Sequence, residues 1–143
     1  FIKDYAISKL GGKMDIKNID HIVLSVADVD ALVKFYEEVL GMQAFCFTGA
    51  DGQERKAVKF GATKINFHDL RAPVKPNAKN MTAGSADICL ICAQPLEEIL
   101  EELKAKDVAP IDGIVARSGA NGKIRSLYLR DPDGNLLELS NYV

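Results

Sequence analysis

The order of the expected secondary structure elements occurs twice along this chain of 143 residues. In the first half, a strand pattern that begins at Asp20 is followed by apolar residues at helical spacing and then by three shorter strand-like runs. Residues 71–86 are rich in Pro, Ala, Asn and Gly and lack an apolar period, which indicates a linker. After this linker, the same order of elements returns over residues 87–143. The repeat therefore predicts two similar units.

Such a duplication limits the architecture, because the helix of each unit covers only one face of its sheet. The other face is bare, so the two units must pack together to bury or line it. We expect an α+β fold in which two tandem βαβββ modules, residues 19–70 and 87–143, form a cupped mixed sheet with the helices on the outer face. Residues 14–143 would make a single domain, which is long enough for a real core.

Residues at the ends of the expected helices support this order. Asp28 is a candidate N-cap before the helical pattern over 29–41, and Gly41 is a candidate stop. The second helix is expected over 95–106, with Pro95 at its start, glutamates early and lysines late. The strands that follow it are expected over residues 108–117, 123–130 and 135–142.

The composition is that of an ordinary globular protein, since 48% of the residues are hydrophobic and 27% are charged. The net charge of −2 gives no signal for nucleic acid or an anionic membrane, so neither is expected as a partner. No apolar run approaches the roughly 18 residues of a membrane span, and no secretory signal is evident, so we expect a cytoplasmic protein. Residues 1–13 precede a methionine and are interpreted as a leader or a tag remainder, with Met14 as the native start.

Three cysteines, Cys46, Cys89 and Cys92, are too few and too odd in number for a disulfide framework, which agrees with a reducing compartment. Cys89 and Cys92 form a C-x-x-C pattern, but residues three apart in a strand point to opposite faces. We therefore interpret the cysteines as ordinary buried residues rather than as a redox pair or a metal clamp.

Strand alternation places four ionisable side chains on the bare faces of the expected sheets. His21 begins the first strand of module one, and Asp87 begins the equivalent strand of module two. His68 and Glu138 lie in equivalent closing strands. An ionised carboxylate inside the apolar run around Glu138 is tolerable only when it is paired or metal-bound. We expect all four side chains on the surface that the two modules share.

Two imidazoles and a carboxylate suit a divalent transition metal, because neutral imidazole and carboxylate oxygen are ligands that such ions accept. A lone strand histidine is more often a hydrogen-bonded structural residue. The chain has only two histidines, however, and both occupy bare-face positions in the repeat. The combined pattern favours a metal site made of His21, His68 and Glu138, with Asp87 as a fourth candidate.

Three stretches, HIVLSV, FYEEVLGM and YLRDPDGNLLELSNY, resemble the vicinal oxygen chelate superfamily of glyoxalases, extradiol dioxygenases and bleomycin-binding proteins. More narrowly, the chain is similar to a virulence-associated glyoxalase-domain subgroup, whose label implies no substrate. The resemblance implies that His21, His68 and Glu138 hold one divalent metal in a cupped sheet formed by both modules. Asp87 stands where many members have a histidine, so it would be a ligand or a residue that orients one.

Three functions are compatible with this pattern. The first is a lyase or isomerase of the lactoylglutathione-lyase type, in which Ni, Zn, Mn, Co or Fe binds adjacent substrate oxygens, Glu138 moves a proton, and a thiol cosubstrate is possible. The second is an Fe(II) extradiol ring-cleaving dioxygenase. The third is a non-catalytic small-molecule binding module of the bleomycin-resistance type, which the two histidines and Glu138 disfavour. The shortness of the chain favours the first function by analogy.

Further residues are candidates for contacting a small-molecule substrate. Lys64 and Asn66 share the face of His68, and Arg125 lies in a neighbouring expected strand, so these residues could hold an anionic or oxygen-rich compound. The alternative is that they are solvated strand residues. Each module also has an exposed sheet edge, and the linker is long enough to complete the cup within one chain or by exchange between chains. We expect a homodimer.

Overall fold

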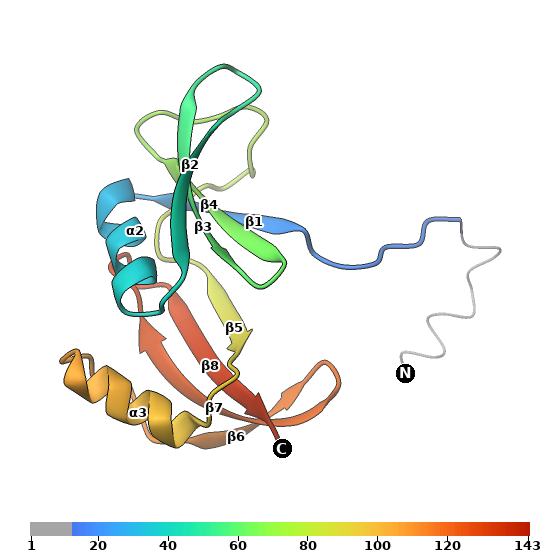
Figure 1. Ribbon diagram of the computed structural model, residues 1–143. Helices are drawn as coiled ribbons and strands as arrows, with labels where there is room; N and C mark the ends of the chain where they lie inside the picture. The colour runs from blue at the N-terminus through green and yellow to red at the C-terminus, as the bar shows by residue number, and fades with distance from the viewer. Residues whose placement is uncertain (1–12) are drawn as a thin grey trace.

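The computed structural model describes residues 13–143 and contains both modules in the predicted order (Figure 1). Module one consists of β1 (His21–Val26), α2 (Val29–Glu38), β2 (Gln43–Thr48), β3 (Glu54–Phe60) and β4 (Thr63–Asp69). Module two consists of β5 (Asp87–Ile91), α3 (Leu96–Ala105), β6 (Val115–Gly119), β7 (Gly122–Arg130) and β8 (Leu136–Tyr142). The expected leader over residues 1–13 falls almost entirely outside the described residues.

The strands form two separate four-stranded sheets, with the orders β1-β4-β3-β2 and β5-β8-β7-β6. In each sheet the first and last strands of the module pair in parallel, whereas the remaining neighbours are antiparallel. Both sheets are therefore mixed and have the same topology, which confirms the predicted α+β fold of tandem modules. β1 and β5 lie at equivalent edges of their sheets.

Each helix begins and ends near the predicted residues. The Asp28 carboxylate accepts a hydrogen bond of 3.2 Å from the Ala31 amide and so caps α2. Gly41 has a φ of 71°, a left-handed conformation that glycine adopts at little cost, and it follows the end of α2. Each helix buries an apolar stripe, made of Leu32 and Tyr36 in α2 and of Leu96, Ile99 and Leu103 in α3.

The strand predicted over residues 108–117 is wrong in its first part, because β6 covers only Val115–Gly119. Pro110 lacks an amide hydrogen and interrupts any strand ladder. Ile111 does reach β7, since its amide donates to the carbonyl of Tyr128 over 2.8 Å, but this contact stands outside a regular ladder. The segment before β6 is therefore a bent connection.

The two modules are joined by a buried hydrogen bond and share one hydrophobic core. Tyr36 of α2 donates its hydroxyl to Oδ2 of Asp131, which lies between β7 and β8, over 2.7 Å. The pKa of Tyr36 is raised, mainly by burial and to a lesser extent by this bond to Asp131. Lys106, just after α3, donates to the carbonyl of Val39 at the end of α2 over 3.1 Å. These contacts involve the helix-covered sides of the modules.

The DPDGN motif forms the turn that makes this joint. Oδ1 of Asp131 accepts hydrogen bonds from the amides of Asp133 and Asn135, over 2.9 and 3.0 Å. The side chain of Asn135 donates to Oδ2 of Asp131 and accepts from the amide of Ala86, at the end of the linker. The motif thus fixes the start of β8, the end of the linker and the position of α2.

No helix in residues 13–143 combines the length and the apolar character that crossing a bilayer requires.

Candidate functional site

The face of each sheet opposite its helix is called here the bare face. Apolar residues that are buried on the helix side, such as Leu24 in β1, Phe67 in β4 and Leu137 in β8, fix which residues point the other way. The bare face of module one carries His21, Val23, Ser25, Lys64, Asn66 and His68, and that of module two carries Asp87, Cys89, Ile91, Leu136, Glu138 and Ser140.

The strand register defines which positions of the two modules are equivalent. In module one, Val23 is paired with Asn66, and in module two Cys89 is paired with Glu138. His21 and Asp87 both precede these pairs by two residues. Asn66 is therefore the positional counterpart of Glu138, whereas His68 lies two residues further along β4.

The predicted ligands are not gathered within one chain. His68 is paired with Ser25, four residues beyond His21, so the two histidines are separated by about 13 Å along the strands. Asp87 and Glu138 belong to the other sheet. The described part of the chain contains no group of three or more His, Cys, Asp or Glu side chains that could hold a metal ion. The ligand set derived from the sequence remains a prediction.

His21 is oriented by the residue that precedes it. Its Nδ1 lies 2.8 Å from Oδ2 of Asp20, and 42% of its side chain is exposed. A neutral imidazole that donates from Nδ1 to a carboxylate presents the lone pair of Nε2, which is the usual arrangement of a histidine metal ligand. His21 can therefore offer one ring nitrogen to an ion or a substrate.

Asn66 has an unpaired oxygen beneath the bare face of module one. The residue is only 6% exposed, and its Oδ1 is the one buried side-chain polar atom without a hydrogen-bond partner among residues 13–143. The amine of Lys64 lies 4.0 Å from the ring centroid of Phe47 on β2, so the Lys64 side chain reaches across the sheet beside Asn66. A buried amide oxygen without a partner is costly, which identifies Asn66 as a position that a ligand would satisfy.

Glu138 is held by a chain of hydrogen bonds on the bare face of module two. The hydroxyl of Ser126 donates to Oε2 of Glu138 over 2.7 Å. The hydroxyls of Ser126 and Ser140 are also 2.7 Å apart, and the thiol of Cys89 lies 3.3 Å from Ser140. Both serines are fully buried. This arrangement fixes one carboxylate oxygen of Glu138 and leaves Oε1 available for other contacts.

Arg125 lies on the other side of the second sheet from Glu138. Its guanidinium forms two hydrogen bonds with the carboxylate of Glu97 on α3, at 2.6 and 2.5 Å. The hydrogen bonds from Arg125 are the main reason why the pKa of Glu97 is lowered to about 2. Arg125 thus faces the helix, and its contact with a substrate stays a prediction.

The expectation of buried cysteines is also corrected. Cys46 and Cys89 are exposed, and Cys92 is half-buried. Cys89 lies on the bare face beside Glu138, whereas Cys92 packs against the core, so the two point to opposite faces as predicted. Although the residue is exposed, partial desolvation of its thiol raises the pKa of Cys89, which favours the protonated form.

The sequence reasoning missed several residues of β6 and β7 on the bare face of module two. Tyr128 is paired with Glu138, and the Nε of Arg117 donates to the Tyr128 hydroxyl over 2.9 Å. Ser126 belongs to the same face. The alternation of Leu127 and Leu129 with these residues is the signal that could have identified them.

The comparison with known families agrees with this geometry. The profile of the Glyoxalase/Bleomycin resistance protein/Dioxygenase superfamily matches residues 18–139, which include all of module one and most of module two, with His21, Asn66, His68, Asp87 and Glu138. The chain belongs to this superfamily.

Proteins that resemble this chain include a virulence protein and a glyoxalase domain-containing protein. Virulence protein STM3117 of Salmonella typhimurium is 46% identical over 92% of this chain and 88% of its own length. The crystal structure of that protein superposes with a TM-score of 0.86 over 91% of this chain and 100% of the crystallised chain. Glyoxalase domain-containing protein RDO1 of Mycosarcoma maydis is 37% identical over 91% of this chain and 71% of its own length.

A more distant member shares the fold of the glyoxalase superfamily. The crystal structure of lactoylglutathione lyase from Agrobacterium tumefaciens is 23% identical and has a TM-score of 0.65, over 89% of this chain and 95% of that chain. This likeness concerns the architecture of the superfamily.

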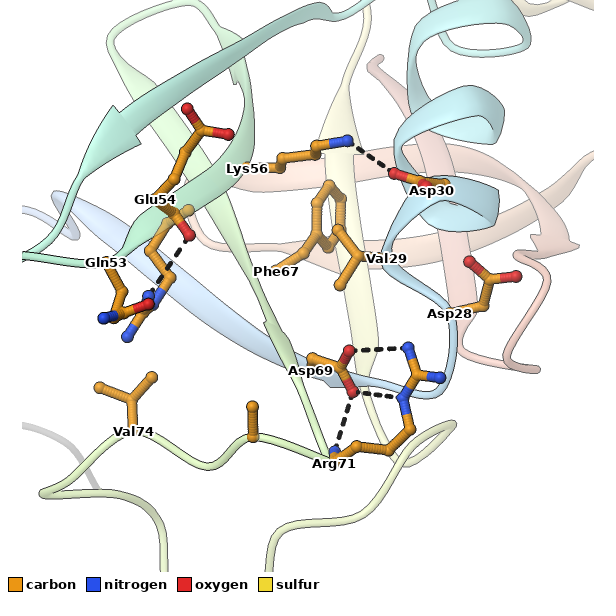
Figure 2. Close-up of a pocket in the computed structure, with 12 residues that line it drawn as sticks. Asp28, Val29, Asp30, Gln53, Glu54, Lys56, Phe67, Asp69, Arg71 and Val74 are labelled. Carbon is orange, nitrogen blue, oxygen red and sulfur yellow. Dashed lines mark hydrogen bonds and ion pairs between the residues drawn. The ribbon is translucent and has the colours of Figure 1, made fainter.

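The hollow in Figure 2 lies on the helix side of module one and is separate from the bare face of this superfamily member. Phe67, whose side chain packs under α2, forms part of its lining. Four of its charged groups form two pairs, since Lys56 contacts Asp30 at 2.7 Å and Arg71 contacts Asp69 at 2.8 Å. This hollow contains none of the predicted metal ligands.

Proposed function

We propose that this protein is a divalent-metal-dependent isomerase of the lactoylglutathione-lyase type that acts on a small substrate with two adjacent oxygen atoms. The observation that carries the proposal is that Asn66 and Glu138 occupy matched positions in the two sheets. Asn66 pairs with the residue two places after His21, and Glu138 pairs with the residue two places after Asp87. These four residues supply one imidazole nitrogen and several oxygen atoms, a set that suits Zn, Ni, Mn, Co or Fe.

The residues present fit a divalent ion. Oδ1 of Asn66 is buried and unpaired, so a cation at this position would satisfy it. His21 and Glu138 each have a hydrogen-bond partner, Asp20 and Ser126 respectively, that leaves one ligand atom free. We therefore propose His21, Asn66, Asp87 and Glu138 as the ligands, with Asn66 in the place that the sequence reasoning gave to His68. When bound, a divalent ion would polarise the substrate oxygens and acidify the neighbouring C–H bond.

The site would be completed by two copies of the chain. β1 and β5 are unpaired edge strands, and they expose the apolar residues Val23 and Ile91, which are 45% and 55% accessible. The hydrogen bonds of Tyr36 and Lys106 between the modules lie on their helix sides, and the linker lies over only the part of the bare face of module one near His68. In a homodimer, the bare face of module one from one copy would meet that of module two from the other, which brings His21 and Asn66 to Asp87 and Glu138.

Glu138 would accept the substrate proton. Ser126 donates to its Oε2, and this bond orients the carboxylate and leaves Oε1 free. A carboxylate held in this way can remove a proton from one carbon and return it to its neighbour. Tyr128, the pairing neighbour of Glu138, and Arg117 would limit the access of water from the side of β6.

A non-catalytic binding module is the second candidate. It is favoured by the fact that no three His, Cys, Asp or Glu side chains gather within residues 13–143 of one chain. A binding module needs only an open face with apolar residues, which Val23 and Ile91 provide.

One experiment separates these functions. The protein is stripped with a chelator, dialysed against Ni, Zn, Mn or Co, analysed for bound metal, and assayed with the hemithioacetal of methylglyoxal and glutathione. We expect one ion per chain and turnover. No bound metal would support the binding module, and O₂ consumption with catechol and Fe(II), without hemithioacetal turnover, would support the dioxygenase.

A further inference from the structure

A hollow of about 370 Å³ lies between the bare face of module one and the linker. β1 and β4 contribute Val23, Ser25 and His68 to it. The linker contributes Pro76, Asn77, Ala78 and Met81. We call this hollow the linker pocket. Its volume falls in the range of small-molecule sites, which is roughly 300–1,000 Å³.

The linker pocket adjoins the proposed metal ligands. Val23 lines the pocket and is paired with Asn66. His68 lies two residues beyond Asn66 on the same face of β4, which is about 6–7 Å. A substrate whose oxygen atoms lie at Asn66 would therefore direct a group of a few carbon atoms into the pocket.

The wall formed by the linker is anchored at both ends. The Leu70 amide donates to the carbonyl of Val26 over 3.0 Å, and the Ala86 amide donates to Oδ1 of Asn135 over 2.9 Å. Gly84 has a φ of 81°, and a Cβ there would collide with the backbone oxygen of Asp133. The two ends of the linker are thus held on the two modules, and its middle part forms one wall of the pocket.

The chemistry of the lining defines the group that fits. Val23, Pro76, Ala78 and Met81 are aliphatic or apolar, whereas the Ser25 hydroxyl and the His68 ring provide hydrogen bonds at the floor. Arg55 is paired with Asp51 at 2.5 Å, and the amine of Lys64 lies against the Phe47 ring at 4.0 Å, so neither charge is part of the pocket lining. The lining suits a compact apolar group that carries a single hydrogen-bonding atom.

We propose that the linker pocket binds the apolar side group of the substrate, with His68 and Ser25 as its hydrogen-bonding residues. This inference rests on the proposed function, because it places the reacting oxygens at Asn66. His68 then has a role in substrate binding rather than in metal binding. The preferred substrates would have a phenyl or branched alkyl side group rather than a methyl group.

The binding test uses benzyl alcohol as the probe and needs no catalytic activity. ¹H–¹⁵N spectra of the full chain should show shifts confined to residues 77–81 and the neighbourhood of His68. Ala78→Phe, which fills the pocket from an exposed linker position, should weaken binding at least about tenfold. Ala109→Phe, a change at an exposed position outside the pocket lining, should have no effect. Shifts located elsewhere, or unchanged binding by folded Ala78→Phe, would overturn the proposal.

A second measurement compares the hemithioacetals of phenylglyoxal and methylglyoxal. Ala78→Phe should lower kcat/KM for the phenyl compound about tenfold more than for the methyl compound. An equal loss for both compounds argues against the pocket. If the wild-type protein turns over neither compound, the isomerase proposal fails, while the benzyl alcohol spectra still decide whether the pocket binds such a group.

Discussion

Ser126 donates a hydrogen bond of 2.7 Å to Oε2 of Glu138 from a position that is completely buried. The hydroxyl of Ser126 also contacts that of Ser140. When Ser140 donates to Ser126, the single hydroxyl proton of Ser126 is donated to the Glu138 carboxylate. The orientation of the Glu138 carboxylate is therefore determined by Ser126, which is buried beneath the bare face.

Ser126→Ala is expected to weaken metal binding by about 10- to 100-fold, because Glu138 would lose the bond that orients it. Isothermal titration with Zn or Mn measures the change. Ser118→Ala, at an exposed position of β6, is the matched control and should bind metal like the wild type. Equal affinities for Ser126→Ala and wild type would mean that this bond does not prepare a ligand.

Asn66→Ala and His68→Ala distinguish the two ligand sets. The set derived from the sequence requires His68→Ala to lose most metal affinity. The strand register predicts instead that Asn66→Ala loses it and that His68→Ala retains it, because Asn66 is the counterpart of Glu138. Elemental analysis under limiting metal decides between them, and retention of metal by Asn66→Ala would refute the register-based set.

Glu138→Gln tests the role of the carboxylate in proton transfer. Glutamine keeps an oxygen atom for the metal but is a very poor proton acceptor, so the metal-replete variant should lose about 10²- to 10⁴-fold in kcat on a hemithioacetal. The bound metal is measured in the same samples. Wild-type rates in a metal-replete variant would exclude Glu138 as the base.

Tyr36→Phe is expected to lower the free energy of unfolding by about 1–3 kcal/mol, because it leaves the buried Asp131 without this donor. Since the pKa of Tyr36 is raised in the fold, its contribution is complete below pH 10.0, the ordinary tyrosine value, and is lost as the pH rises above it. Urea unfolding between pH 7 and 11 should therefore show an alkaline loss of stability that is smaller in Tyr36→Phe. Tyr142→Phe, near the C-terminal end, is the control, and identical pH profiles for Tyr36→Phe and wild type would contradict this account.

Light scattering at micromolar concentration is expected to give the mass of a homodimer. Ile91→Asp should shift the protein toward the monomer, because it would place a charge on the apolar edge that the proposed interface buries. Ile111→Asp changes a residue of similar exposure, 47%, outside that edge and should remain dimeric. A monomeric wild-type protein would rule out the two-copy site.

The face assignment could be predicted from the sequence, but the register could not. Alternation correctly placed Leu24, Phe67 and Leu137 on the helix side, because the side-chain period of a strand is two. A shift of two residues keeps the face, however, so alternation does not distinguish Asn66 from His68 as the counterpart of Glu138. Only the pairing of β4 with β1 separates them.

The choice of Arg125 as a candidate rested on another argument. This residue was chosen because its strand neighbours that of Glu138, although it has the same parity as Leu127 and Leu129, which are buried against the helix side. Applying alternation to that strand selects Ser126 and Tyr128 instead. The sequence did not predict that Asn66 is buried beside the Lys64 side chain. This burial depends on contacts between residues of different strands across the sheet.

The bond between Tyr36 and Asp131 also bears on how a duplicated chain becomes one cooperative unit. The two halves share this buried bond, in which a phenol of module one donates to a carboxylate of module two. If either module were produced alone, the phenol or the carboxylate would lose its counterpart and the shared core would be open to water. The halves of this protein have thus become interdependent, and we expect them to unfold in a single transition.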